Sequence, residues 1–216
     1  ALPPFTTSTM QQDASAKLNM SSPMCMQVAQ HLYEGIETSE GHLALVTYIR
    51  TDSVRISAES QATAREYIKE KYGEEYVPAK PNIYKGRKGA QDAHEAVRPS
   101  YVELTPAEVK DSLSNQQFKL YKLIYERFMA SQMAEMVYET NTVSFDANGC
   151  TFRASGQRTM FDGYTVVYIE GRDDVQEKDV TLPEIHQGDV FTAHKIESEQ
   201  RFTQPPPRYT EAVSYT

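Results

Sequence analysis

This sequence lacks most of the features that mark the common functional classes, and positive charge is the clearest shortage. Its 216 residues carry 22 lysines and arginines against 30 aspartates and glutamates, a net charge of −8. A generic nucleic-acid binder is normally basic, so the chain as a whole does not fit that class. Cys25 and Cys150 lie far apart and provide neither a zinc spacing nor a disulfide framework, so a reducing compartment is the default expectation.

The sequence also lacks a membrane-spanning run and a phosphate-binding loop. No apolar run approaches the roughly 18 residues that a membrane-spanning helix requires, so we expect no membrane partner. No G-x-x-x-x-G-K-[ST] phosphate loop is present, so nucleotide-driven chemistry is not indicated. The hydrophobic content of 39% with 24% charged residues is ordinary for a folded chain, and the length predicts one or two domains.

The negative charge is concentrated in the second part of the chain. Residues 1–135 hold 15 cations and 17 acids, whereas residues 136–216 hold 7 and 13. Between residues 80 and 98 only two acids accompany five cations, which are Lys80, Lys85, Arg87, Lys88 and Arg98. Any contact with DNA is therefore expected in the first part of the chain, although this cluster could equally be a solvated loop.

The residue pattern predicts a mainly helical unit over residues 1–135 and a β-rich unit over residues 136–204. Capped helices are expected over Thr6–Asn19, from Ser22, over Ala58–Tyr72, from Thr105, and from Ser114 to about Met133. The first two are compatible with a helix-turn-helix. The Asn148-Gly149 pair predicts a hairpin, and Thr165–Ile169 and Val190–Ile196 are expected to add strands. Residues 205–216 are assigned to the start of a further domain.

The segment with the most chemical content is Thr47–Ser53, which reads T-Y-I-R-T-D-S and follows an apolar run. Side chains alternate faces in a strand, so Tyr48 and Arg50 should point the same way. A guanidinium beside a phenol suits a phosphate and favours the phenolate, whereas an isolated tyrosine, with a pKa of about 10, is a poor nucleophile at neutral pH. Such a pair is also common in surface packing, so the spacing alone leaves both interpretations open.

Four segments, in this order, resemble the type IA DNA topoisomerases, and bacterial topoisomerase I in particular. Thr47–Ser53 resembles the active-site segment of the family, and Pro3–Gln12, P-P-F-T-T-S-T-M-Q-Q, resembles the opening of its tyrosine-bearing domain. Gln91–Pro99, Q-D-A-H-E-A-V-R-P, resembles the histidine-bearing segment, and Arg201–Arg208 resembles the re-entry into a later domain. The resemblance implies a multi-domain α and β architecture, the type IA topoisomerase fold, in which a helical tyrosine-bearing domain precedes part of a β-rich arch.

The resemblance also implies an isomerase that relaxes negatively supercoiled DNA without ATP. In the family, the tyrosine that matches Tyr48 attacks a backbone phosphate of single-stranded DNA, forms a 5′-phosphotyrosyl link and frees a 3′-hydroxyl; strand passage and religation follow. Arg50 would bind the scissile phosphate, and His94 would lie at the active site. Glu95 and Arg98 are interpreted as residues that hold the histidine segment in place.

Five residues are candidates for contact with DNA: Arg50, Thr51, Asp52, Ser53 and Gln12. Thr51, Asp52 and Ser53 could instead form the turn that fixes the tyrosine, and Asp52 could simply pair with Arg50. Gln12 lies in the first predicted helix together with Thr7 and Ser8, whose hydroxyls are explained equally well by helix capping.

The metal site of the family is an acidic cluster containing D-x-D in a TOPRIM domain, and this sequence contains no D-x-D. We therefore expect Mg²⁺ to be bound in the full enzyme by a domain absent from this chain, and no metal ligand within it. The sequence is interpreted as a fragment that is inactive alone. Its expected partners are single-stranded DNA and the missing TOPRIM and gate domains, and its expected location is the bacterial cytoplasm, at the nucleoid.

Two other functional classes stay open at this point. Tyrosine recombinases carry their nucleophile after their basic residues, near the end of the catalytic domain, whereas Tyr48 comes early and before His94. A non-enzymatic module that binds single-stranded DNA or acts as a scaffold is the second class. A basic recognition helix would favour this second class, and Lys17 is the only lysine or arginine in the first two predicted helices.

Overall fold

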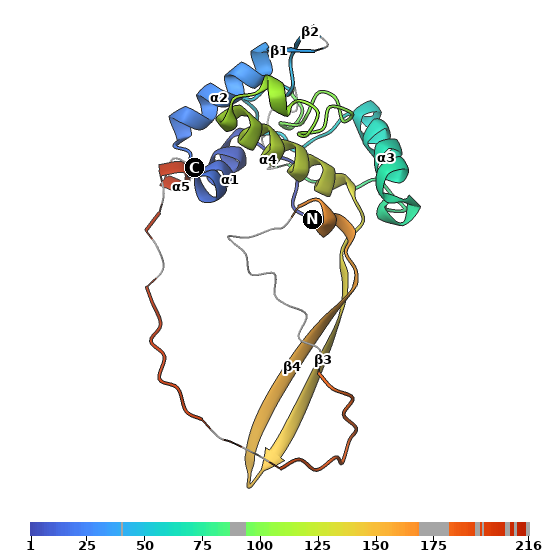
Figure 1. Cartoon of the computed structure of the whole chain (residues 1–216), viewed down its shortest axis with the longest axis vertical. Helices are drawn as coiled ribbons and strands as arrows, with labels where there is room; N and C mark the ends of the chain where they lie inside the picture. The colour runs from blue at the N-terminus through green and yellow to red at the C-terminus, as the bar shows by residue number, and fades with distance from the viewer. Residues whose placement is uncertain are drawn as a thin grey trace. The chain divides into compact units, whose positions relative to one another are not determined.

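The computed structural model of the chain describes residues 1–39, 41–86, 94–168, 182–192, 195, 197–205, 208–209 and 211–214. The chain divides into two compact units. The first comprises Ala1–Met136, Asp162–Asp173 and Thr210–Thr216, and the second comprises Val137–Phe161 and Asp174–Tyr209. The long helices belong to the first unit and the long hairpin belongs to the second (Figure 1).

Within the described residues, the body of the first unit is built from α1 (Thr7–Leu18), α2 (Ser22–Glu34), α3 (Ala58–Tyr72) and α4 (Asn115–Gln132). Thr6, Ser57 and Ser114 cap α1, α3 and α4 by accepting a hydrogen bond from the backbone N–H three residues later. These caps confirm the sequence prediction, because a hydroxyl satisfies a helix-end N–H that has no partner inside the helix. The cap of α2 is Ser21, one residue earlier than predicted.

The core of the first unit forms around α4, which crosses the middle of the unit and contacts α1, α2 and α3 (Figure 1). Leu120, Ile124 and Phe128 of α4 are fully buried. Each such side chain contributes roughly 1.5–3 kcal/mol when it leaves water. This packing holds α1, α2 and α3 to the same central helix.

Short elements complete the first unit. A small hairpin of β1 (Ile36–Thr38) and β2 (Gly41–Leu43) follows α2, and η1 (Glu74–Tyr76) follows α3. The helix predicted from Thr105 is wrong: turns lead to the single 3-10 turn η2 (Lys110–Ser112), although the Thr105 N–H still bonds to the Glu108 carboxylate at 2.7 Å. The stretch before the next cap is too short to sustain a stable helix of its own.

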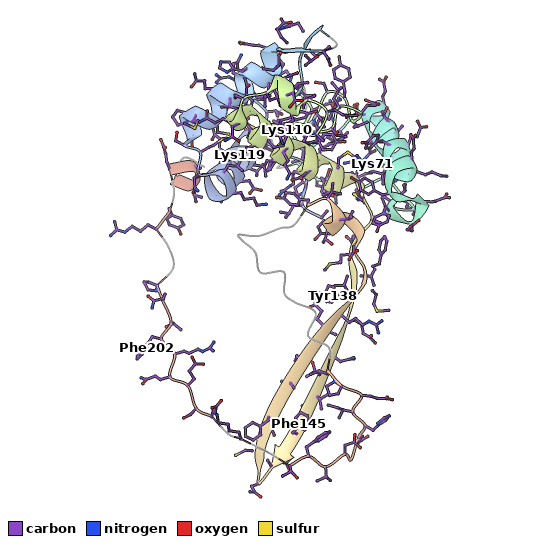
Figure 2. All side chains as sticks on the ribbon, in the orientation of Figure 1. Lys71, Lys110, Lys119, Tyr138, Phe145 and Phe202 are labelled. Carbon is purple, nitrogen blue, oxygen red and sulfur yellow. The ribbon has the colours of Figure 1, made fainter. Side chains whose placement is uncertain are left out.

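The second unit contains a long antiparallel hairpin in which β3 (Val137–Ala147) pairs with β4 (Cys150–Phe161). Asn148 and Gly149 form its two-residue turn with φ angles of 51° and 78°, as a type I′ turn requires. This confirms the predicted hairpin. Most side chains of both strands are exposed, and Figure 2 labels Tyr138 and Phe145 among those of β3.

The two further strands predicted for the β-rich unit are wrong where the structure describes them. Residues 165–166 belong to the 3-10 helix η3 (Gly163–Val166), and residues 190–192 form no strand. Gly163 turns the chain with a φ of +54°, and the hydroxyl of Tyr168 bonds to α1 and α4, so this segment packs on helices instead of extending a sheet. Residues 169, 193, 194 and 196 lie outside the described residues.

Candidate active site

Three segments that are far apart in sequence meet at one end of the helical core. Phe5 and Val97 form an isolated antiparallel bridge in which the Val97 N–H donates to the Phe5 carbonyl at 2.8 Å. Val46 and Pro99 form a second bridge. These contacts bring together the three segments around residues 3–12, 47–53 and 94–99.

The strand predicted to carry Tyr48 is wrong, because within the described part of the chain the segment has one isolated bridge, at Val46, and it bends at residues 49–50. Side-chain bonds take the place of a ladder. The Thr47 hydroxyl donates to the Ala96 carbonyl at 2.8 Å and accepts from the Arg98 N–H at 3.0 Å. The Thr47 N–H donates to the Arg98 carbonyl at 3.0 Å. These bonds therefore tie Thr47, the residue before Tyr48, to the segment that carries His94.

The phenol ring of Tyr48 lies between two other rings. Its centroid is 4.8 Å from that of His94, with the planes tilted by 43°. On another side Tyr33, at the end of α2, meets it edge to face at 5.5 Å and 67°. Tyr48 is 36% exposed, so the ring is held by its neighbours while part of it remains open to a ligand.

Arg50 is exposed, as Tyr48 is, while Ile49 between them is fully buried. This alternation is the one expected of an extended segment, despite the absence of a strand. Asp52 is also exposed, and among the described residues Arg50 has no ion-pair partner, so Asp52 does not neutralise it. The exposed guanidinium is therefore available to bind an anion.

Thr51 and Ser53 are buried, at 8% and 2% exposure, and build the turn that follows Arg50. The Thr51 hydroxyl accepts from the Ser53 N–H at 3.0 Å, and the Ser53 hydroxyl accepts from the Arg55 N–H at 3.1 Å. Both hydroxyls thus have a local structural partner. Contact of either residue with DNA stays a prediction.

The remaining predicted residues lie around these segments. Gln12 is half-buried on α1. The Arg98 guanidinium bonds to the Glu95 carboxylate at 2.7 Å and to the Pro99 carbonyl at 2.9 Å, a pair that stiffens the segment after His94. Residues 91–93 of the histidine segment, and Arg87 and Lys88 of the basic cluster, lie outside the described residues.

Tyr33 and Thr47 take part in the site although the sequence did not single them out. Tyr33 follows the buried Leu32 in α2 and is partly buried against the core, which is the usual place of an aromatic residue in a helix. No local signal separates a ring that only packs from one that also holds a neighbour. Thr47 directly precedes the tyrosine and could have been suspected only from that position.

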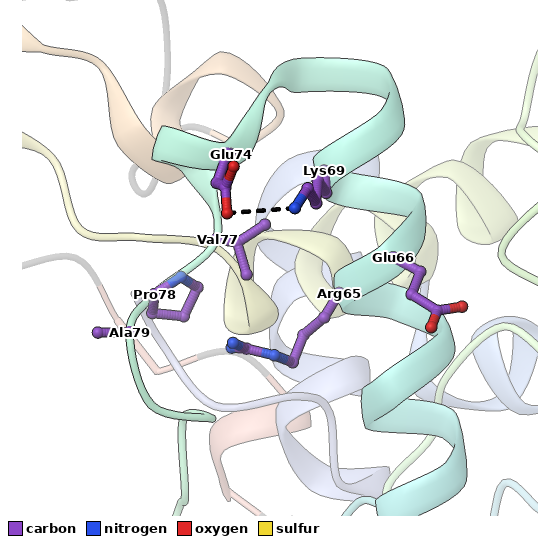
Figure 3. A pocket seen from close by; sticks show the side chains of 7 residues that line it. All are labelled: Arg65, Glu66, Lys69, Glu74, Val77, Pro78 and Ala79. Atoms are coloured by element: carbon purple, nitrogen blue, oxygen red, sulfur yellow. Dashed lines mark ion pairs between the residues drawn. The ribbon is translucent and has the colours of Figure 1, made fainter.

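A separate hollow of about 360 Å³ lies beside α3 (Figure 3). Its lining includes Arg65, Lys69 and Glu74, and Lys69 pairs with Glu74 at 3.1 Å. Arg65 Nη1 is buried and has no hydrogen-bond partner within the described structure. With Glu66 also in the lining, the hollow carries as many acids as cations, so its charge favours neither an anion nor a cation.

The described residues offer no metal site and no membrane anchor of the helical kind. No group of three or more His, Cys, Asp or Glu side chains in the described part of the chain is arranged to hold a metal ion. No helix there is both long and apolar enough to cross a bilayer.

Comparisons with known proteins show the family to which the chain belongs. A family model described as DNA topoisomerase matches residues 1–213. The solved structure of full-length topoisomerase I from Thermotoga maritima, in a monoclinic crystal form, is 39% identical with a TM-score of 0.67. The match covers 83% of this chain and 29% of that one, so the chain spans well under half the length of that relative. The chain belongs to the type IA DNA topoisomerases, and the predicted family and fold class are confirmed.

Proposed function

We propose that this chain supplies the nucleophile of a DNA topoisomerase that cuts one strand at a time, and that the nucleophile is Tyr48. The observation that carries the proposal is the position of the Tyr48 ring, 4.8 Å from His94 and 36% exposed, in a segment held by bonds from two distant parts of the chain. A nucleophile needs both a fixed position and an open face, and this ring has both.

In the proposed reaction the Tyr48 oxygen attacks a backbone phosphorus of single-stranded DNA. The bond from phosphorus to the 3′ oxygen breaks as the bond from phosphorus to the tyrosine oxygen forms. The phenol loses its proton, the departing 3′ oxygen gains one, and the phosphate stays attached to the 5′ end. One phosphodiester replaces another, so religation needs no ATP, and passage of the second strand before religation relaxes negative supercoils.

Arg50 and His94 serve this step in different ways. Arg50, two residues after Tyr48, carries a permanent charge and is proposed to stabilise the negative charge that grows on the phosphate oxygens in the transition state. His94 lies against the Tyr48 ring, where an imidazole can hydrogen-bond the phosphate or a reacting oxygen. Gln12 and Asp52 are proposed to contact the strand to either side.

We propose that the complete reaction also needs domains of the same enzyme other than those in this chain. No group of three or more His, Cys, Asp or Glu side chains among the described residues is arranged to hold Mg²⁺. We propose that the TOPRIM domain of the same enzyme binds Mg²⁺, and that TOPRIM and gate domains complete the strand groove. The chain alone is then expected to leave supercoiled DNA unrelaxed. We propose that the enzyme works at the bacterial nucleoid, in the cytoplasm.

The test is a covalent trap. The chain is mixed with the TOPRIM-containing part of a type IA enzyme, Mg²⁺ and an oligonucleotide labelled at its 5′ or its 3′ end, and the mixture is denatured and resolved by size. The proposal predicts that the protein retains the 3′ label and releases the 5′-labelled piece. Tyr48→Phe should abolish this adduct. Tyr101→Phe, which changes another exposed tyrosine of the first unit, should not.

Co-elution of the two proteins is measured first, so that a missing adduct has one meaning. A complex that co-elutes and binds the strand without forming an adduct would contradict the proposal, and an adduct that survives Tyr48→Phe would assign the wrong residue. The alternative of a DNA-binding helix-turn-helix module has little support, because Lys17 is held by Tyr168 and Asp13 within the fold.

A further inference from the structure

Thr7 is the first residue of α1, but its hydroxyl does not cap the helix. The cap is complete without it, because Thr6 and Thr9 form a reciprocal capping box. The Thr7 hydroxyl instead reaches the segment that follows Tyr48. It accepts a hydrogen bond from the Thr51 N–H at 2.8 Å, and its own hydrogen lies within reach of the Ile49 carbonyl at 2.7 Å and the Thr51 carbonyl at 3.0 Å.

These bonds enclose Arg50 from both sides. The Thr7 N–H adds one more, to the Thr51 carbonyl at 2.8 Å, so the peptide groups before and after Arg50 are both tied to the first turn of α1. The Ile49 side chain is fully buried, which prevents the segment from turning over. Arg50 itself is exposed, so its backbone is tied down while its side chain stays accessible to solvent.

We propose that Thr7 is a positioning residue that holds Arg50 in place for the scissile phosphate. The proposal rests on the function proposed above, in which Arg50 binds that phosphate. Thr7 acts only through the backbone of Arg50, and loss of its hydroxyl removes the placement of the charge but not the charge. The covalent step should therefore slow more than strand binding weakens, because a displaced group stabilises the transition state poorly.

The first arm of the test needs no DNA. Valine has nearly the shape of threonine but no hydroxyl, so Thr7→Val should speed hydrogen exchange of the Thr51 amide about tenfold, the usual scale for one lost hydrogen bond. Thr7→Ser should leave it slow. Thr63→Val is the matched control, because among the described residues the Thr63 hydroxyl bonds only to the Glu59 carbonyl within α3. Unchanged exchange in Thr7→Val would show that the Thr7 hydroxyl does not hold the backbone around Arg50, independently of any activity on DNA.

The second arm measures the rate of adduct formation in the co-eluting complex at saturating oligonucleotide. Thr7→Val should slow it at least about tenfold, Thr7→Ser should restore it, and strand affinity should change less. In an Arg50→Ala background, Thr7→Val should have little further effect, because both changes remove the same interaction. Equal slowing in both backgrounds would overturn a role through Arg50. If the unaltered protein forms no adduct, the proposed function and the role of Thr7 in it both fail. The hydrogen exchange of the Thr51 amide still tests whether Thr7 holds the backbone around Arg50.

Discussion

The hydroxyl of Tyr168 joins three charged side chains, and its removal is the sharpest test of how the helical unit is held together. It accepts hydrogen bonds from Lys17 Nζ at 2.6 Å and Arg127 Nη1 at 3.0 Å, and it donates to Asp13 Oδ2 at 2.9 Å. Arg127 also donates from Nε to the Pro3 carbonyl at 2.7 Å. The group thus connects α1, α4 and the segment that follows β4.

The cost of Tyr168→Phe follows from how buried each partner is. A hydrogen bond to a charged group is worth about 1.5–3 kcal/mol. The side chains of Lys17 and Asp13 are 21% and 27% exposed, so water can replace the lost hydroxyl there, whereas the Arg127 side chain is only 6% exposed. We count the bond to Arg127 in full and give the bonds to Lys17 and Asp13 little weight. The free energy of unfolding should then fall by about 2 kcal/mol, which lowers Tm by roughly 4–8 °C for a chain of this size.

Urea unfolding followed by far-ultraviolet circular dichroism measures this loss, because the helices belong to the unit in question. Tyr101→Phe is the control: Tyr101 is 46% exposed, and its hydroxyl has no hydrogen-bond partner among the described residues. In an Arg127→Met background the effect of Tyr168→Phe should shrink, since the main partner is gone. A loss no larger than that of Tyr101→Phe would refute the reasoning.

Three further predictions follow from local geometry. Gly163→Ala should lower the free energy of unfolding by more than about 1 kcal/mol, because Gly163 has a φ of +54° and a new Cβ would meet backbone atoms at 2.5 Å; an unchanged urea midpoint would contradict this. Burial raises the pKa of the Cys25 thiol to about 12 while Cys150 is exposed, so iodoacetamide should label Cys150 rapidly and Cys25 only on unfolding, and two equally fast phases would contradict the burial. Burial also raises the pKa of Tyr121 and Tyr125; the stability gained from their protonated forms is intact below the ordinary tyrosine pKa of about 10 and falls above it by roughly 1.4 kcal/mol per pH unit for each. Tyrosinate absorbance from these two should therefore rise only as helical signal is lost, and their titration in folded protein would contradict the prediction.

The features that could be predicted from the sequence are those decided by neighbouring residues. Thr6, Ser57 and Ser114 cap helices because each hydroxyl bonds to an N–H only three residues away. The Asn148-Gly149 turn was predictable for the same reason, since both residues tolerate a positive φ. A short-range bond has the same partner whatever the rest of the chain does.

Features that depend on a distant partner were predicted less well. Strands are predicted at Thr165–Ile169 and Val190–Ile196, but a strand also needs a neighbour with free backbone groups. The Tyr168 hydroxyl instead bonds to side chains of α1 and α4, and no local sequence pattern predicts these bonds. The predicted strand at Tyr48 failed differently: its alternation of burial is present, but side-chain bonds from Thr7 and Thr47 take the place of a ladder.

The candidate site shows why the family resemblance reached further than periodicity. Residues Tyr48 and His94 are 46 positions apart, and nothing in either segment indicates that the two rings meet at 4.8 Å. Their meeting depends on backbone bonds from Phe5 to Val97 and from Thr47 to Arg98. Every one of these contacts lies within the first unit, and none involves the hairpin. The geometry around Tyr48 should therefore depend on the stability of the helical core and be insensitive to changes in β3 and β4.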